Sequence, residues 1–191
     1  THTLSELIRY YEIYNKAEGK SSKTFTWYSA NLWRFKNFLT GRHLPDSISC
    51  LDTRILREYI LHLMESRRYD LHPYNPTTEE LLSVFTIHGH VRTLRAFFNW
   101  LAREGFTETN IARDIKPPKL IEKVVSPLTD QEITSILQAF NPSNSIHFRD
   151  RVIFMILLDT GLRIGELLNP KMNDIHADEG VLKVLGKGKK E

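Results

Sequence analysis

The sequence predicts a mainly α-helical protein, in which a four-helix bundle is followed by a smaller domain of mixed α/β structure. Before residue 105, apolar residues recur at spacings of three and four, the period of an amphipathic helix. After residue 128, helical stretches lead into a short segment of alternating apolar and polar residues that ends in glycines, as a strand and its turn do. A proline-containing stretch separates the two parts. We therefore expect a first domain over 1–116, a linker over 117–127 and a second domain over 128–191.

Four helices are predicted in the first domain, over about residues 3–16, 22–39, 53–66 and 77–104. The second and the fourth alternate spacings of three and four most strictly, so each presents one apolar face to a core. In the second helix this face consists of Phe25, Tyr28, Leu32, Phe35 and Leu39. In the fourth it consists of Val84, Ile87, Val91, Leu94, Phe98 and Leu101. Asp52 or Thr53 is the expected N-cap of the third helix.

The second domain carries its own start signal. Thr129 and Glu132 are three residues apart and fit a capping box at the start of a helix over about 130–140. A nearly continuous apolar run then predicts a buried helix over about 147–158. Near the end of the chain, the run GVLKVLGKGKK predicts a strand that enters a tight glycine turn.

Composition narrows the class of protein. The formal net charge of +3 is a mild sign of an anionic partner, and residues 1–123 carry the excess, with 18 Lys and Arg against 14 Asp and Glu. The single cysteine, Cys50, excludes an intrachain disulfide and suits a reducing compartment such as the cytoplasm. The longest apolar run has seven residues, too few to span a membrane, so no membrane partner is expected. His88 and His90 point apart on a helix, and no metal site is predicted.

A polar stripe borders the apolar face of the fourth predicted helix. It consists of His88, Arg92, Arg95 and Asn99, each one position beyond an apolar residue. Two interpretations fit this stripe. Its side chains either meet a phosphate or a base, or they form a solvated rim whose aliphatic stems cover the core, and the pattern alone favours the rim.

The stretch TGLRIGELL places a charged residue next to a glycine turn. If Thr160 or Gly161 begins a helix, Arg163 lies in its first turn, where free amides and the helix dipole favour an anion. Glu166 would share its face. Lys187, between two glycines, is expected at the tip of a hairpin, where it can approach a ligand closely. The alternatives are an ordinary Arg–Glu pair and a solvent-exposed turn lysine.

Taken together, TGLR-x-x-E-L-L followed by a strand and GKGKKE closely resembles the tyrosine recombinases, also called the phage integrase family. LTDQEITSIL is similar to the opening of that family's catalytic domain. VRTLRAFFNWLAREGF is similar to the end of its N-terminal core-binding domain, a SAM-like helical bundle. The resemblance extends over nearly the whole chain.

The resemblance implies an enzyme that cuts and rejoins DNA through a 3′-phosphotyrosine intermediate, without metal or cofactor. Arg163 matches the arginine that binds the scissile phosphate, Glu166 the acidic residue that supports the site, and Lys187 the general acid for the leaving 5′-oxygen. The family's remaining catalytic residues, a His-x-x-Arg pair, a further His or Trp and the tyrosine nucleophile, have no counterpart in this chain. We therefore expect a truncated catalytic domain, and no DNA cleavage by the chain alone.

The resemblance also implies duplex DNA as the partner and a homotetramer on DNA for the full-length enzyme. The two domains are expected to form a clamp around DNA, with the second and fourth helices of the first domain facing it. The expected contacts, mostly to phosphate, are Lys23, Arg34, Lys36, His88, Arg92, Arg95, Lys116 and Lys119.

Two other classes of function stay open. A DNA-binding module without catalysis, such as a decayed integrase, would keep the basic helices without needing Arg163 and Lys187 together. A helical protein-interaction protein would carry its positive charge incidentally, and its binding to DNA would be absent or insensitive to salt.

Overall fold

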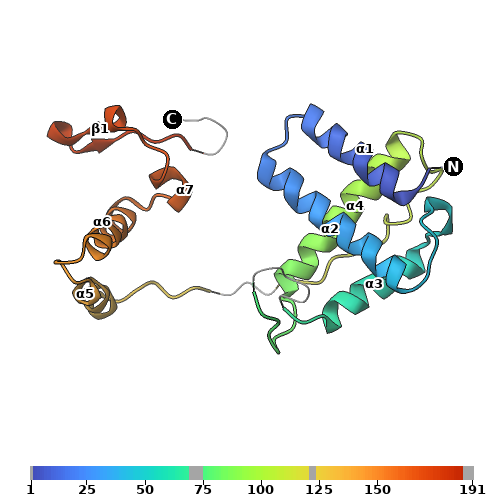
Figure 1. Cartoon of the computed structure of the whole chain (residues 1–191), viewed down its shortest axis with the longest axis horizontal. Helices are drawn as coiled ribbons and strands as arrows, with labels where there is room; N and C mark the ends of the chain where they lie inside the picture. Colours follow the sequence, from blue (N-terminus) through green and yellow to red (C-terminus); the bar gives the residue numbers. More distant parts are fainter. Residues whose placement is uncertain (1, 69–74, 121–123, 187–191) are drawn as a thin grey trace. The chain divides into compact units, whose positions relative to one another are not determined.

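The computed structural model describes residues 2–68, 75–120 and 124–186. Contacts within the chain divide it into two compact units, residues 1–122 and residues 123–191, which we call the N-terminal and C-terminal units. Figure 1 shows a bundle of helices in the first unit, and helices together with a small strand pair in the second. The mainly α fold class predicted from the sequence is confirmed.

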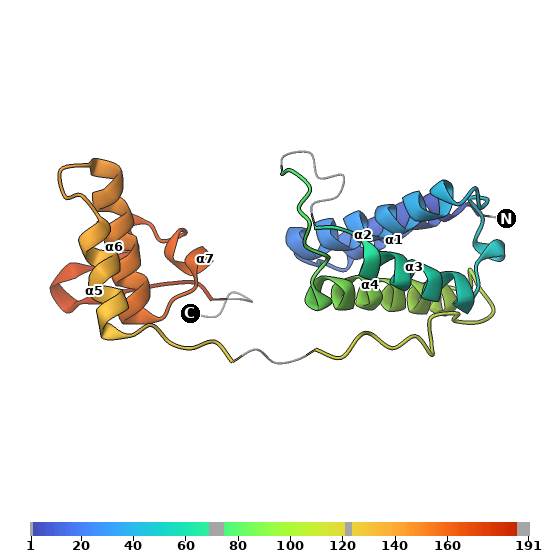
Figure 2. The same ribbon diagram turned by 90° about the horizontal axis from the view of Figure 1, so that it is seen from below.

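The N-terminal unit is a four-helix bundle. Its helices are α1 (Leu4–Ala17), α2 (Ser22–Gly41), α3 (Thr53–Glu65) and α4 (Val84–Arg103). A short 3₁₀ helix, η1 (Ile48–Cys50), precedes α3. Helix α2 contacts both α1 and α4, and α3 contacts α4. In Figure 2, α1 and α2 lie on one side of the bundle, and α4 lies on the other.

The start of α4 differs from the prediction of a helix from about residue 77. The chain is instead not helical here, and the Leu82 amide donates to the Ser66 carbonyl at 3.0 Å. Residues Arg67 and Leu81 form an antiparallel bridge. Because these amides bond to the segment after α3, the helix begins only when the Ser83 hydroxyl accepts from the Thr86 amide at 3.1 Å.

Most of the apolar residues predicted for the second and fourth helices form the core, whereas Phe25 and Tyr28 of α2 are only half-buried. Leu32, Phe35 and Leu39 of α2 are buried, and five of the six predicted α4 positions are buried as well, namely Ile87, Val91, Leu94, Phe98 and Leu101. The sixth, Val84, is exposed because it lies in the first turn of the shortened helix. Asp52 caps α3 as predicted, its carboxylate accepting from the Ile55 amide at 2.8 Å.

One titratable pair lies inside this core. The side chain of His90 is buried, and its Nδ1 lies 3.3 Å from the Tyr59 hydroxyl. Burial lowers the pKa of His90 to about 4, because an imidazolium loses its hydration there, and the positive charge of Arg34 adds to this effect. His90 is therefore neutral at pH 7 and belongs to the structure of the bundle. Its sequence neighbour His88 is only half-buried.

The buried His90 predicts acid-sensitive folding. Its pKa is about 4 in the folded unit and about 6.5 in an unfolded chain, so the unfolded state binds more protons between these values. The neutral, buried His90 therefore contributes fully to the free energy of unfolding above pH 6.5. This contribution of about 3 kcal/mol is lost as the pH falls toward 4. Urea unfolding at several pH values would measure it. We expect His90→Asn to flatten this dependence and His88→Asn to leave it; an unchanged profile in His90→Asn would contradict the assignment.

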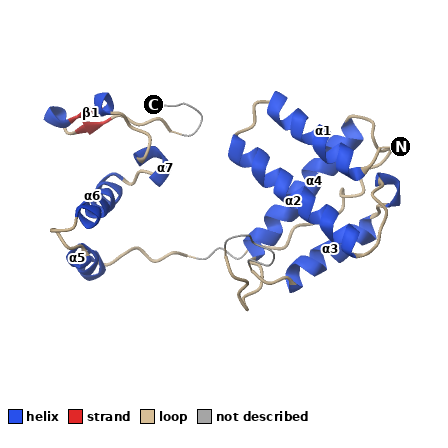
Figure 3. Cartoon of the chain, viewed as in Figure 1, coloured by secondary structure: helices blue, strands red, loops and turns tan. Residues whose placement is uncertain are grey.

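The C-terminal unit combines helices with a short antiparallel strand pair (Figure 3). They are α5 (Asp130–Ala139), α6 (Ser145–Thr160), α7 (Ile164–Leu167), η2 (Met172–Asp174), β1 (Ile175–His176), η3 (Ala177–Glu179) and β2 (Val181–Leu182). The two strands pair antiparallel, with Ile175 opposite Leu182. The predicted capping box is confirmed, because the Thr129 hydroxyl accepts from the Glu132 amide and the Glu132 carboxylate from the Thr129 amide.

The prediction that the helix over 147–158 is buried is wrong. No described residue of the C-terminal unit is buried. Helix α6 contacts α7, and its Phe154 ring lies 6.4 Å from Phe140, but these neighbours cover only part of its apolar surface. Val152, Met155 and Leu158 therefore stay exposed.

None of the helices in the described part of the chain has the length and apolar character needed to cross a membrane.

Candidate functional site

The TGLR turn connects α6 to α7. Helix α6 continues through Thr160, and Gly161 ends it in a left-handed conformation with φ of 65°, which glycine adopts without steric cost. The expectation that Thr160 or Gly161 begins a helix, with Arg163 in its first turn, is therefore wrong. Arg163 is instead the N-cap of α7, a single turn of four residues. A macrodipole needs longer helices, so an anion here would have to be held mainly by the guanidinium.

Arg163 and Glu166 are joined by two hydrogen bonds within this turn. One carboxylate oxygen of Glu166 accepts from the Arg163 amide at 2.9 Å, and the other accepts from Arg163 Nη1 at 2.8 Å. These hydrogen bonds lower the pKa of Glu166, and the bond from the Arg163 amide has the larger effect. Glu166 therefore stays ionised at neutral pH. The Arg163 side chain is 80 % exposed and that of Glu166 only 14 %. Glu166 thus orients a guanidinium that remains open to solvent.

The hairpin after this turn is described only in part. Lys187, the predicted general acid, lies outside the described residues. The strands before it are held by the Lys183 amide, which donates to the Asp174 carbonyl at 2.8 Å. The strand predicted in GVLKVLGKGKK is found at Val181–Leu182.

A second candidate site lies on the N-terminal unit, between α2, α4 and the segment after α4. It is a groove of about 440 Å³, here called the arginine groove, lined by Tyr28, Arg92, Arg95, Ala96, Asn99, Asn110, Ala112 and Arg113. Within the described part of the chain, the side chains of Arg92, Arg95 and Arg113 make no hydrogen bond or ion pair. Three uncompensated guanidinium groups around one groove favour a polyanion.

Arg113 was missed by the sequence interpretation. It lies in a turn after α4, between the buried residues Ala112 and Ile115. Asn110 stabilises this turn, because its side-chain oxygen accepts from the Ala112 amide at 2.9 Å. The signal in the sequence was the pair of apolar residues three apart, which anchors the turn and leaves Arg113 outside.

A further groove, here called the tryptophan groove, adjoins the arginine groove and shares Tyr28 and Arg92 with it. This tryptophan groove is lined by Lys23, Thr24, Trp27, Tyr28, Gly89 and Arg92. Lys23 and Arg92 were both predicted as DNA contacts, and the fold brings them together from different helices. Trp27 lines the same groove and was not predicted.

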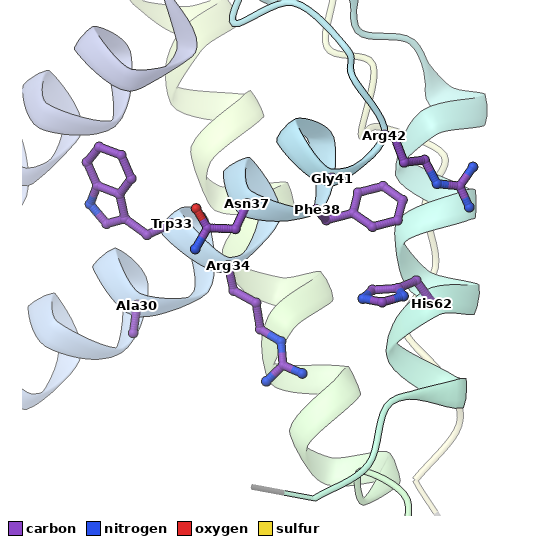
Figure 4. Close-up of a pocket in the computed structure, with 8 residues that line it drawn as sticks. All are labelled: Ala30, Trp33, Arg34, Asn37, Phe38, Gly41, Arg42 and His62. Atoms are coloured by element: carbon purple, nitrogen blue, oxygen red, sulfur yellow. The ribbon is translucent and has the colours of Figure 1, made fainter. Parts of the chain in front are cut away.

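A third groove lies between α2 and α3 (Figure 4), lined by Ala30, Trp33, Arg34, Asn37, Phe38, Gly41, Arg42 and His62. The Phe38 and His62 rings are 5.0 Å apart, and the Arg42 guanidinium lies 5.0 Å from the Phe38 ring. Arg42 is also paired with Glu58 at 2.7 Å. Arg34 and Asn37 carry no side-chain hydrogen bond or ion pair among the described residues, so of the two arginines only Arg34 is available for a new ligand.

The other predicted contacts are more dispersed. Lys36 and His88 line none of these three grooves. Lys116 and Lys119 are exposed in the extended segment that follows Ile115. In the described part of the chain, no three His, Cys, Asp or Glu side chains gather as a metal site would require.

A helical bundle that carries a groove of arginines, followed by a carboxylate-held arginine on a glycine turn, fits the resemblance to the tyrosine recombinases noted in the sequence. Comparisons with known proteins agree. Residues 127–191 match the phage integrase family. The chain is 30 % identical over 175 residues to tyrosine recombinase XerD of Proteus mirabilis, covering 91 % of this chain and 50 % of that protein. It is 27 % identical over 180 residues to tyrosine recombinase XerC of Halalkalibacterium halodurans, covering 94 % and 54 %.

Solved structures give the same fold. A lambda integrase tetramer bound to a Holliday junction matches with a TM-score of 0.70 and 23 % identity, covering 98 % of this chain and 48 % of that chain. A lambda integrase dimer bound to a core site matches with a TM-score of 0.69. The chain is a member of the tyrosine recombinase, or phage integrase, family. It spans about half the length of the relatives that it matches.

Proposed function

We propose that this chain is the DNA-binding part, and the first part of the catalytic domain, of a site-specific tyrosine recombinase. The observation that carries the proposal is the arginine groove, where Arg92, Arg95 and Arg113 lie together and none of the three pairs with a carboxylate among the described residues. In this proposal residues 1–116 are the core-binding domain, residues 117–127 the linker and residues 128–191 the start of the catalytic domain.

Duplex DNA is the polyanion that fits such a surface. Two helices contribute to it, with Lys23 on α2 and Arg92 and Arg95 on α4. Long cationic side chains spread along crossing helices meet phosphates on a backbone, and these contacts position the protein rather than read sequence. Arg34 in the α2–α3 groove, Lys36, His88 and the extended-segment residues Lys116 and Lys119 are proposed as further contacts.

The catalytic part of the proposal centres on Arg163. Its exposed guanidinium has two N–H edges, of which Glu166 occupies only part, and the rest can bind the non-bridging oxygens of a phosphodiester. There it would stabilise the charge of a pentacovalent transition state. Lys187 is proposed as the general acid for the leaving 5′-oxygen. The full-length enzyme is proposed to assemble as a tetramer on DNA.

The DNA-binding proposal predicts a defined salt dependence. Binding of the chain to a mixed-sequence DNA duplex should weaken steeply with salt, since each phosphate contact releases counterions. We expect Arg92→Gln and Arg95→Gln each to weaken binding and to reduce the slope of log affinity against log salt by about 1. Fluorescence anisotropy at several salt concentrations would measure this.

The matched control is Arg57→Gln. Arg57 is an exposed arginine on α3 that makes no hydrogen bond or ion pair among the described residues, and it lines none of the three grooves. The substitution Arg57→Gln should leave the slope of log affinity against log salt unchanged. Binding that is insensitive to salt, or equally affected by all three variants, would reject the arginine groove and favour a protein-interaction module.

A further inference from the structure

Trp27 is an exposed aromatic residue on the cationic surface. Its side chain lies on α2, and the residue is 45 % exposed. The tryptophan groove that it lines also contains Lys23, one turn earlier on α2, and Arg92 on α4, and neither cation is engaged in an ion pair within the described residues. One side of the indole packs toward the buried His90, with ring centroids 6.1 Å apart. Much of its remaining apolar surface faces solvent in the free protein.

Gly89 is the residue that allows the indole to lie there. A Cβ atom at position 89 would be 2.8 Å from Cζ2 of Trp27, closer than two non-bonded carbon atoms approach in proteins. Gly89 has no positive φ, so the helix itself does not require glycine. A glycine inside a helix destabilises it relative to alanine. The three atoms nearest to such a Cβ all belong to the Trp27 side chain, so it is the indole that occupies the space left by the glycine.

We propose that Trp27 is an apolar contact to duplex DNA, held in the tryptophan groove by its packing across Gly89. The inference rests on the proposed function, because it places the indole beside two phosphate-binding cations. With Lys23 and Arg92 on phosphates, the backbone or groove edge between them lies against the indole. Deoxyribose carbons and the thymine methyl group are the apolar groups that duplex DNA offers at such a position.

A double-mutant cycle on the whole chain tests this contact. Trp27→Ala should weaken binding to the mixed-sequence duplex about ten-fold, as truncation of a buried interface tryptophan commonly does. The salt slope should stay unchanged, because an apolar contact releases no counterions. Gly89→Ala should weaken binding too, since the indole must move away from the new methyl group. Combined with Trp27→Ala, the substitution Gly89→Ala should cause no further loss.

Two further variants separate a local contact from general damage. Trp27→Phe keeps an apolar ring and should bind with intermediate affinity. Phe85→Ala removes another exposed aromatic residue, 58 % exposed in the first turn of α4 and outside the three grooves, and should bind normally. Thermal melting by circular dichroism checks that each variant folds. Gly89→Ala should raise the melting temperature more in the Trp27→Ala variant than in the wild-type protein. In the variant no indole ring opposes the new methyl group.

A duplex in which uracil replaces thymine identifies the DNA group. If wild-type protein loses affinity on it and Trp27→Ala does not, the contact is to the thymine methyl; equal affinity on both duplexes assigns it to deoxyribose. Wild-type affinity in Trp27→Ala, or additive losses for Trp27→Ala and Gly89→Ala, would overturn the proposal while leaving DNA binding through the arginines intact. A wild-type chain that binds no duplex at all would reject the proposed function itself.

Discussion

Arg163→Ala is expected to reduce DNA strand cleavage by the full-length recombinase at least about a hundred-fold while leaving DNA affinity nearly unchanged. The reason is that the guanidinium would act mainly on charge that develops at the phosphate during cleavage. One donor lost from such a site commonly lowers the rate by about 10² to 10³. A suicide DNA substrate that traps the covalent intermediate would measure cleavage, and anisotropy would measure binding.

Arg149→Ala is the matched control for this experiment. Arg149 lies on α6 in the same unit, is well exposed, and pairs with the carboxylate of Asp150 at 2.7 Å, much as Arg163 pairs with Glu166. Removing it should leave cleavage unaffected. Unchanged cleavage in Arg163→Ala would refute the catalytic assignment. Complete absence of a covalent adduct in the unmodified full-length protein would favour a DNA-binding module without catalysis.

Phe98→Ala is expected to destabilise the N-terminal unit by about 3–5 kcal/mol. The Phe98 side chain is 1 % exposed and packs edge-to-face against Phe97 and Phe35, with ring centroids 5.4 Å and 6.4 Å apart. Its truncation would leave a cavity that rigid neighbouring helices fill only partly. Urea unfolding followed by circular dichroism and by hydrogen exchange at α4 amides would measure the loss.

The comparable change in the C-terminal unit should have a much smaller effect. Phe154 of α6 is only partly buried, and the neighbouring ring that it meets is Phe140 at 6.4 Å. We expect Phe154→Ala to cost less than about 1 kcal/mol, since little apolar area is exposed anew. Equal losses for the two substitutions would show that Phe154 packs as fully as Phe98, contrary to its partial burial in the structure.

Most of the bundle could be predicted from the sequence because its signals are local. The spacing of Leu32, Phe35 and Leu39 fixes one buried face, and Asp52 marks the start of α3 through its side-chain cap. In the C-terminal unit, Thr129 marks the start of α5 in the same way. The start of α4 could not be predicted in this way. The residues before it favour a helix locally, but their amides bond to Ser66 and the segment after α3, and tertiary pairing overrides propensity.

The candidate sites were predictable only in part. Lys23, Arg92 and Arg95 follow from helical position, whereas Arg113 comes from a turn and Trp27 from the contact between two helices, which no periodicity reveals. The helix boundary at Gly161 was predictable in principle, because glycine is favoured just after a helix and not at its start. The role of Lys187 stays a prediction from the family resemblance.

The double hold of Glu166 on Arg163 has a consequence for the thermodynamics of substrate capture. An arginine side chain carries about 2 kcal/mol of rotamer entropy, which a freely moving residue loses when it meets its ligand. Here the amide and guanidinium are fixed by the same carboxylate before any DNA arrives. Under the proposed function, part of that ordering would be completed during folding, so an arriving phosphate would meet a preorganised cation and more of the attraction would be available for the reaction itself.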